Sequence, residues 1–426
     1  MLKFIFKKAG YGLLVLFGVI TVVFFLFNLA PGDPVRNLLG ENAPEQVAAD
    51  MRHKFGLDLP IGTRYFVYLN DLSPISFHSA KDTASSIFFD GEKYSAAFTI
   101  PLPAGAMVAV KSPFLNRSFL TERSVASILG DVIPGTIVLA VVSMFFALLL
   151  GLIFGIIAAL KKDTLYDRLV LIVSAIGMSG PSFFMAILVA WIGAILWRDE
   201  IIIPVFPLAL LLLIGAMFAA KPANYTWARV IAVTRNISWV VLGAWIIGRV
   251  AGYSFSGLGG TIRLPGTGLN MTGSLFSVDV WKGQYLDLKN LVLPVLTLMI
   301  RPLAVVVQLT RSSMLEVLSM DFIRTARAKG LRERRVILVH ALRNALNPVI
   351  TAVSGWFASL LAGAVFVEFV FGWKGLGQQM FTAIEKQDLP VVMGGVIVIS
   401  TAFVLINFLV DLVYGWIDPR IRLSGA

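Results

Sequence analysis

Long apolar runs, separated by short polar segments, dominate the sequence. A run of about twenty apolar residues is long enough to cross the ~30 Å hydrocarbon layer of a membrane as a helix. Such runs lie at Tyr11–Ala30, Ile133–Leu160, Leu169–Trp197, Leu291–Val317, Val349–Phe371 and Val391–Trp416. The pattern predicts an all-α polytopic membrane protein.

Two further apolar runs, Ile201–Ala220 and Ser238–Gly252, lie between the third and fourth of these. The basic residues Arg229 and Arg235 lie between the two runs, which favours a cytoplasmic connection. Two extra spans leave the orientation of everything downstream unchanged. Because the second run is short and contains Arg249, a single re-entrant or interfacial segment is the alternative.

Composition supports a membrane protein and excludes several other classes. Of the 426 residues, 57% are hydrophobic and 14% are charged, and the net charge is +11. The basic residues gather in short loops between apolar runs, where they orient spans, so nucleic-acid binding is not expected. The chain has no cysteine and three scattered histidines, so it offers no disulfide and no Cys or His cluster for a metal.

The distribution of charge predicts the orientation of the chain. Lys3, Lys7 and Lys8 precede the first apolar run, which predicts a cytoplasmic N-terminus. A cleaved signal peptide is the alternative, but the run is longer than an ordinary signal core and no small-x-small site follows. Residues 31–131 carry nine Lys/Arg and eleven Asp/Glu, which suits the extracytoplasmic side. Within this region, alternating residues at Ala96–Val110 predict a β-hairpin.

The sequence therefore divides into five parts. They are an N-terminal span (1–30), an extracytoplasmic region (31–131), spans 2 and 3 (132–200), the inserted spans with an extracytoplasmic loop (201–290), and a last part (291–426) that contains a basic loop (320–348).

The basic loop 320–348 is ordered by its own sequence. Between Asp321 and Arg343 it has seven Lys/Arg against two acidic residues. Asp321 opens a short helix and Gly330 is placed as its C′ stop, which suits the helix dipole. A second helix is expected from about Arg332 to Ala345, ended by Asn347-Pro348.

Small residues on the first helix, Thr325, Ala326 and Ala328, would let another protein approach closely. We therefore interpret the loop as a docking element. The alternative is a solvated basic loop that only fixes topology.

Three polar residues in apolar runs are candidates for a transport path. Arg301 and Gln308 lie in the fourth run, and Glu368 lies near the end of the fifth. A charge near mid-membrane is costly and usually faces a cavity or a partner. Arg301 is expected to face the path or to pair with Glu368, or else to reach an interface or a partner subunit. Arg311, nearer the inner end, is expected to snorkel.

Several motifs resemble one family. The loop segments TARAKGL (325–331) and HALRNA (340–345) are similar to the cytoplasmic coupling loop of the oligopeptide/dipeptide branch of ABC importer permeases. LAPGDP (29–34), GAVFVEFVFG (363–372) and DPRIR (418–422) resemble other motifs of that branch. Lys374 replaces a proline of the family pattern, and residues 70–117 and 201–252 have no counterpart in it.

The resemblance implies a type I importer permease with a six-span core, here with two probable extra spans and a large extracytoplasmic insertion. Such a chain forms half of the translocation path. Its partners would be a second homologous permease, two ABC ATPases and an extracytoplasmic substrate-binding protein, within membrane lipids. The location implied is the bacterial cytoplasmic (inner) membrane, with both termini in the cytoplasm. The implied ATPase-coupling residues are Asp321, Arg324, Thr325, Ala326, Arg327, Ala328, Lys329 and Gly330.

The chain is not expected to be an enzyme. It has no Gly-x4-Gly-Lys-Ser/Thr motif, so ATP and Mg²⁺ would bind the partner ATPase and no cofactor would bind this chain. Peptides are the expected substrate, with nickel chelates, glycosides and antibiotic peptides as alternatives. An ion-coupled carrier, and a scaffold that uses the basic loop to bind anionic lipid, are the competing classes.

Overall fold

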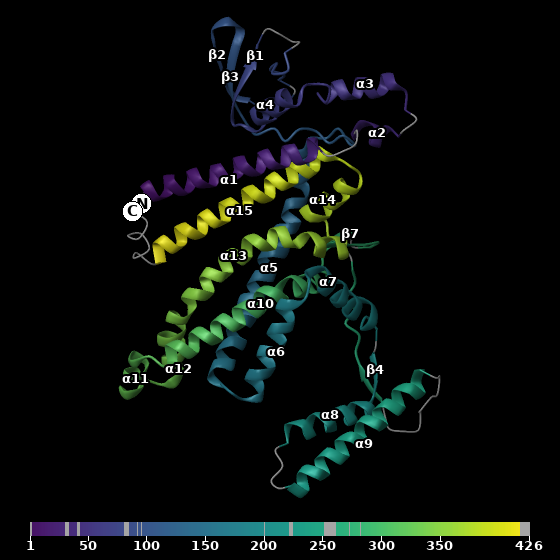
Figure 1. The fold of residues 1–426 in the computed structure, drawn as a ribbon, viewed down its shortest axis with the longest axis vertical. Coiled ribbons are helices and arrows are strands. Elements are labelled where there is room, and N and C mark those ends of the chain that lie inside the picture. The colour runs from purple at the N-terminus through teal and green to yellow at the C-terminus, as the bar shows by residue number, and fades with distance from the viewer. Residues whose placement is uncertain are drawn as a thin grey trace. The chain divides into compact units, whose positions relative to one another are not determined.

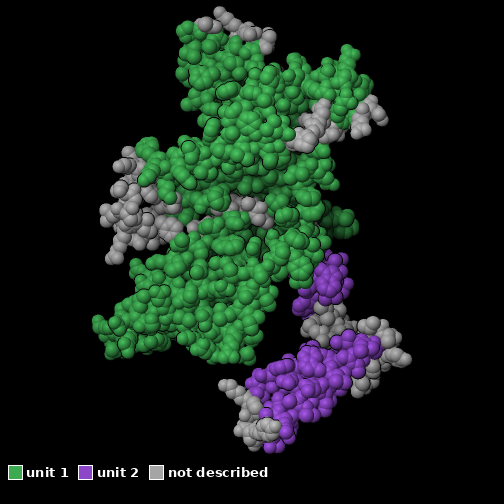
Figure 2. All heavy atoms as spheres, viewed as in Figure 1, with its two compact units in different colours: residues 1–188, 271–426 green, residues 189–270 purple. Residues whose placement is uncertain are grey.

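The computed structural model describes most of the chain and divides it into two compact units. The described residues are 2–29, 34–40, 43–80, 85–91, 93–94, 96–199, 201–220, 225–250, 261–271, 273–281 and 283–417. Unit 1 comprises residues 1–188 and 271–426, and unit 2 comprises residues 189–270 (Figure 2). Parts of the LAPGDP motif and all of the DPRIR motif lie outside the described residues.

Unit 1 contains the helices of the expected six-span core (Figure 1). They are α1 (Leu2–Asn28), α5 (Val125–Leu160), α6 (Leu165–Ser179) followed by α7 (Ser182–Ala190), α10 (Lys289–Leu318), α13 (Leu342–Val370) and α15 (Leu389–Ile417). Over the described residues of both units, six helices are long and apolar enough to cross a membrane, or seven if the bent pair α6–α7 is one span. The prediction of an all-α polytopic protein is confirmed.

Glycines bring α5 and α10 into close contact. A Cβ on Gly151 would lie 2.6 Å from Cγ1 of Val306, and a Cβ on Gly155 would lie 2.6 Å from Cβ of Thr310. Small residues at such positions let helices approach where lipid offers little hydrophobic drive for association. The contact continues to Gly177 of α6, where a Cβ would lie 3.0 Å from Ile300. α10 is therefore the helix that holds α5 and α6 together.

The predicted span Leu169–Trp197 is bent at its Gly180-Pro181, where α6 and α7 meet at an angle of 111°. Pro181 cannot donate a helical hydrogen bond, and its ring disfavours helical dihedrals for the residue before it. Gly180 accordingly adopts an extended conformation with φ −71° and ψ 133°. A π-helical turn, Trp191–Leu196, follows α7.

The expected helix break at Asn347-Pro348 is wrong. α13 continues through Pro348, and the irregularity lies earlier, in a π-helical turn at Val336–Ala341 that follows the short α12 (Glu333–Arg335). Side chains bond neighbouring carbonyls: Asn344 Nδ2 donates to His340 O at 2.9 Å and Thr351 Oγ1 donates to Asn347 O at 3.1 Å. Pro348 lacks the N–H that would bond the carbonyl of Asn344, and membrane helices tolerate such a loss.

Between α1 and α5 lies a small mixed region of unit 1. It contains α2 (Pro34–Leu39), α3 (Glu45–Lys54), α4 (Ile61–Leu72) and a sheet in the order β1-β3-β2, with β1 at Ile75–Ser79, β2 at Ala96–Pro101 and β3 at Ala106–Lys111. β2 and β3 pair antiparallel, which confirms the predicted hairpin. Gly105, with φ +80°, supplies the left-handed residue of the connection.

Beneath this sheet lies a buried polar cluster. The carboxylate of Asp71 accepts from Tyr94 Oη at 2.6 Å and from Lys93 Nζ at 3.1 Å, and its carbonyl accepts from Lys111 Nζ at 2.5 Å. His78, 1% exposed, contacts Ile87 O through Nδ1 at 3.2 Å and Ser76 Oγ through Nε2 at 2.9 Å. Since a carbonyl only accepts, Nδ1 carries the proton of the neutral ring. The cluster fixes α4 to the sheet.

The rest of unit 1 consists of short elements. They are the hairpin β6 (Phe276–Asp279) and β7 (Gly283–Leu286), α11 (Asp321–Ala328) and α14 (Leu376–Glu385).

Unit 2 contains one span-length helix where two extra spans were expected. The strand β4 (Ile201–Pro204) pairs with β5 (Thr261–Leu264), so the first predicted run does not begin as a helix. The helix α8 (Val205–Ala219) has 15 residues, about 22 Å, and is too short to cross alone. α9 (Tyr225–Val250) is longer than predicted and includes Arg229 and Arg235. The expectation of eight spans is therefore not met among the described residues.

The buried histidine predicts that the sheet region weakens in acid. Burial lowers the pKa of His78 below its usual 6.5, and Lys111 and Lys93 face it together with Asp71. Below about pH 6.5 the unfolded segment therefore binds the proton more readily than the folded one. The stability of the folded segment then decreases as the pH decreases. Hydrogen exchange of β1 and β3 amides, corrected for intrinsic rates, should speed up between about pH 7.5 and about 5.5. His78→Gln should flatten this dependence, and an unchanged slope in that variant contradicts the assignment.

Candidate functional site

The helix α11 has a buried face and an exposed face. Ile323, 0% exposed, and Ala326, 7% exposed, pack against the ends of three longer helices. The cluster that they join comprises Ala159, Met314, Val317, Val336, Ala341 and Ala345, and is called the coupling core below. Because α5, α10 and α13 each contribute to this core, α11 is fixed to the bundle and does not form a separate loop.

The other face of α11 is exposed and basic. Asp321, Phe322, Arg324, Thr325, Arg327, Ala328, Lys329 and Gly330 are all exposed. Of the implied coupling residues, Ala326 alone points inward, so the expectation that its small side chain admits another protein is wrong. Its size instead lets α11 pack closely on its own bundle. The structure thus brings seven of the eight implied coupling residues to one surface.

Gly330 ends α11 in a Schellman motif. Its N–H donates to Arg327 O at 2.9 Å, and the N–H of Leu331 donates to Ala326 O at 3.4 Å. Gly330 has φ +73°, a left-handed conformation that costs a residue with a Cβ about 1–2 kcal/mol. The carbonyls at the end of α11 are thereby satisfied, and the chain turns back toward α12.

An ion pair crosses this turn. Arg327 donates from Nε to Glu333 Oε2 at 3.2 Å and from Nη2 to Glu333 Oε1 at 2.6 Å. The hydrogen bonds to Glu333 raise the pKa of Arg327. Both side chains are about half exposed, so the ion pair adds little stability. It nevertheless connects α11 directly to α12. Arg324 lies on the exposed face, 3.6 Å from Asp321 one turn earlier.

A second ion pair lies close to the coupling core along α10, where Arg311 precedes Met314 by three residues. Arg311 of α10 donates to Asp167 of α6 from Nε at 2.5 Å and from Nη2 at 2.7 Å. Asp167 is 2% exposed and also accepts from the Asp163 N–H at 2.9 Å, while Thr164 caps the start of α6. Arg311 was expected to snorkel; instead it joins α6 to α10. Asp167 was not predicted, although an acid in the first turn of a span is a recognisable signal.

The predicted pair of Arg301 with Glu368 is wrong. Glu368, 0% exposed, accepts from Thr136 Oγ1 at 2.6 Å and from the N–H groups of Gly377 at 2.6 Å and Gln378 at 3.2 Å. The last two begin α14, so Glu368 caps that helix from α13. A Cβ on Gly375 would lie 2.3 Å from the Glu368 carboxyl carbon, which explains the glycine there.

Thr136 of α5 completes this junction by accepting the Leu376 N–H at 2.8 Å, and Trp373 Nε1 donates to Gly135 O at 3.2 Å. Glu368 is therefore a structural residue that joins α13, α5 and α14. Sequence reasoning missed Thr136 because the contact spans more than two hundred residues.

Arg301 lies beside a small cavity. Its guanidinium is 5.8 Å from the ring centroid of Trp356 on α13, within reach of a cation–π contact. The cavity has a volume of about 70 Å³ and is bounded by the α6–α7 bend, α10 and α13. Gln308 is half-buried, seven residues further along α10 and so on the same face. The described residues contain no group of three His, Asp or Glu side chains arranged to hold a metal ion.

Gly330→Val should loosen α11, because valine is strained in the left-handed conformation by about 1–2 kcal/mol. Hydrogen exchange of the α11 amides should become about tenfold faster. Gly330→Asn is the matched control, since asparagine tolerates this conformation, and it should exchange nearly as the native chain does. Equal protection in the two variants would contradict the role assigned to Gly330.

Glu368→Ala should destabilise the bundle by about 3 kcal/mol or more, because the N–H groups of Gly377 and Gln378 and the Thr136 hydroxyl lose this partner. Thermal unfolding of the purified chain in detergent measures the loss. Glu385→Ala, which removes an exposed carboxylate from the other end of α14, is the control and should unfold as the native chain does. If exchanging the charges of Arg301 and Glu368 restored stability, the capping role would be refuted.

Comparison with known proteins agrees with these features. Residues 151–423 match the family described as binding-protein-dependent transport system inner membrane component, and residues 1–88 match the N-terminal family of the same transport systems. The chain is similar to the di/tripeptide transport system permease protein DppB of Pseudomonas aeruginosa, with 33% identity over 99% of both chains. It is also similar to the dipeptide transport system permease protein DppB of Haemophilus influenzae, with 32% identity over 99% of this chain and 100% of the relative.

A third relative, the probable D,D-dipeptide transport system permease protein DdpB of Escherichia coli K12, is 32% identical over 99% of this chain and 98% of its own length. Matches of this extent, over helices that form a multi-pass bundle, establish the family. The chain is a multi-pass inner membrane protein that belongs to the binding-protein-dependent transport system inner membrane component family.

Proposed function

We propose that this chain is a permease subunit of an ATP-driven importer of short peptides. Its family, and relatives that are named as permeases for dipeptides and tripeptides, support this substrate class. The chain would form half of the path across the membrane, and a second, homologous permease would form the other half. An extracytoplasmic binding protein would deliver the peptide. Two ABC ATPases would bind ATP and Mg²⁺.

The observation that carries the coupling part of the proposal is the two-sided packing of α11. Its inner face, through Ile323 and Ala326, is part of the coupling core, and its outer face offers Phe322 among basic side chains. An ATPase groove that binds the outer face would move the ends of α5, α10 and α13 together. The ATPase must bind this face differently in its two states, because a ligand shifts a conformational equilibrium only through differential affinity.

We infer the orientation of the chain from the distribution of its basic residues. α11 and the N-terminus lie in the cytoplasm, and the β1-β3-β2 sheet lies outside. The basic loop 320–348 then obeys the positive-inside rule. The cavity beside Arg301 would belong to the path, with Arg301 and Gln308 on the face of α10 that meets the peptide. Glu368, which is occupied in capping α14, is assigned no contact with substrate.

The coupling role is tested on the exposed face of α11. Arg324→Glu reverses a charge on a side chain that is 78% exposed, and Ala328→Trp adds bulk on the same face. Each variant should reduce the amount of ATPase recovered with the tagged chain about tenfold or more. The new glutamate would repel the acidic groups of a partner that binds a basic face, and the new tryptophan would obstruct docking by its size. The second permease should still be recovered. Binding is measured by co-purification from detergent-solubilised membranes.

Arg123→Glu is the matched control, because Arg123 precedes the start of α5 and the coupling core lies at the end of α5. This variant should retain the ATPase. If both α11 variants retain the ATPase at the native level, the loop serves topology alone.

A further inference from the structure

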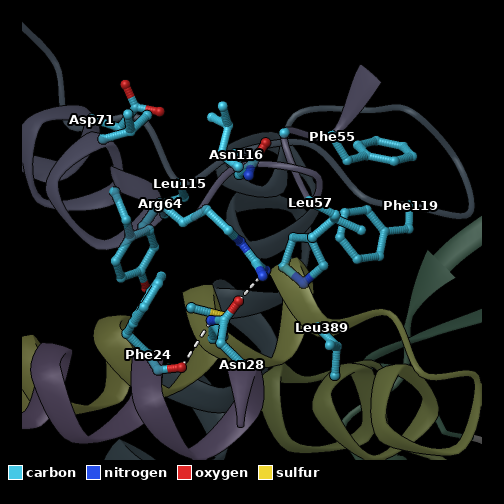
Figure 3. A pocket seen from close by; sticks show the side chains of 16 residues that line it. Phe24, Asn28, Phe55, Leu57, Arg64, Asp71, Leu115, Asn116, Phe119 and Leu389 are labelled. Atoms are coloured by element: carbon cyan, nitrogen blue, oxygen red, sulfur yellow. Dashed lines mark hydrogen bonds between the residues drawn. The ribbon is translucent and has the colours of Figure 1, made fainter. Parts of the chain in front are cut away.

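A second cavity lies in unit 1, apart from α11 and the Arg301 cavity. It has a volume of about 120 Å³ and lies where the end of α1, the start of α15, α4 and the segment around Leu115–Phe119 meet (Figure 3). Its walls are largely apolar, with Phe24, Phe55, Leu57, Phe119 and Met393 among them. Nothing in the proposed coupling or transport path uses this cavity.

The cavity contains an arginine without a counter-charge. The guanidinium of Arg64 points down toward Asn28, and its Nη2 donates to Asn28 Oδ1 (Figure 3). The Asn28 amide is itself oriented by donating from Nδ2 to Phe24 O at 2.8 Å. Within the described part of the chain, no carboxylate lies within ion-pair distance of Arg64. A half-buried cation that lacks a counter-ion is costly, and an anion in the cavity would remove that cost.

The nearest acid, Asp71, does not supply the counter-charge. Its carboxylate turns away from Arg64 in Figure 3 and binds Lys93 and Tyr94 instead. Asp71 is thus paired with Lys93, and the charge of Arg64 is left without a partner among the described residues that line the cavity.

A second donor lines the same cavity. The hydroxyl of Tyr68 is buried and has no hydrogen-bond partner among the described residues. Burial raises the pKa of Tyr68, so the group remains an O–H donor. Buried hydroxyls are nearly always satisfied in native proteins, and an orphan donor that lines the same cavity as an uncompensated guanidinium indicates a missing acceptor. Arg64 and Tyr68 lie four residues apart on α4, so they occupy one face of that helix.

We propose that this cavity binds the C-terminal carboxylate of a peptide together with its apolar terminal side chain. This assignment rests on peptides being the substrate class. Arg64 and Tyr68 bind the carboxylate oxygens, and Phe24, Phe119 and Met393 contact the side chain. A volume of about 120 Å³ holds one residue and not a whole dipeptide, so the remainder of the peptide lies outside the cavity. The site then selects a free, apolar C-terminus and leaves the N-terminal residue unspecified.

The test is calorimetric titration of the full-length chain in detergent, without ATPase or other partners. The probes are the dipeptide Ala-Leu with a free C-terminus and the same dipeptide with an amidated C-terminus. The free acid should bind at least about tenfold more tightly, because amidation removes the charge that pairs with Arg64. Arg64→Gln and Tyr68→Phe should each weaken binding of the free acid and leave the small affinity for the amide unchanged.

Arg123→Gln, an exposed arginine paired with Asp131 elsewhere in unit 1, is the matched control and should bind Ala-Leu as the native chain does. Equal affinity for acid and amide, absence of saturable binding, or displacement of Ala-Leu by equimolar acetate would each overturn the proposal. The last result would mean an unselective anion site. Because no ATPase is present, these outcomes are separate from those of the α11 variants, which can succeed or fail independently.

Discussion

The proposed coupling of the chain to an ATPase depends on the packing of Ile323 and Ala326 against the coupling core. A solvated loop of the same charge could bind a partner but would transmit no displacement to the spans. The hydrophobic effect fixes α11 instead, since two apolar side chains leave water where α5, α10 and α13 end. Protein interiors are close-packed and deform little, so a movement of α11 must be shared by the helices that surround it.

Hydrogen bonds and ion pairs between polar side chains also join the helices, at places where apolar packing alone would not specify which helices pair. In a bilayer, lipid competes with side chains for every apolar surface, and directional contacts fix which helices pair. Arg311 with Asp167 joins α10 to α6, and Glu368 with Thr136 joins α13 to α5 and to the start of α14. Each of these acids has its oxygens occupied by donors, as a buried carboxylate requires. Their role is positional, whereas Arg301 and Arg64 have no carboxylate partner among the described residues and remain available to a ligand.

The sequence predicted those features that depend on neighbouring residues. The apolar runs gave the core helices, and Gly330 ended α11 as expected because a left-handed stop is a local property. The predictions failed where tertiary contacts decide. The inward direction of Ala326 depends on the coupling core, and the partners of Glu368 lie in α5 and α14, far along the chain. The two prolines show the same limit: Gly180 before Pro181 can extend and breaks the helix, whereas Asn347 before Pro348 remains helical.

The coupling core and the α14 junction are linked by segments of equal length in two helices. α5 contributes Thr136 to the junction and Ala159 to the core, and α13 contributes Glu368 to the junction and Ala345 to the core. Each pair is separated by 23 residues, about 35 Å of α-helix. The helices run antiparallel and are joined at both ends, so neither can slide along the other without breaking the core or the Glu368 cap. Under the proposed coupling, force applied to α11 would move α5 and α13 as one unit, because the joined ends prevent a shift of either helix alone.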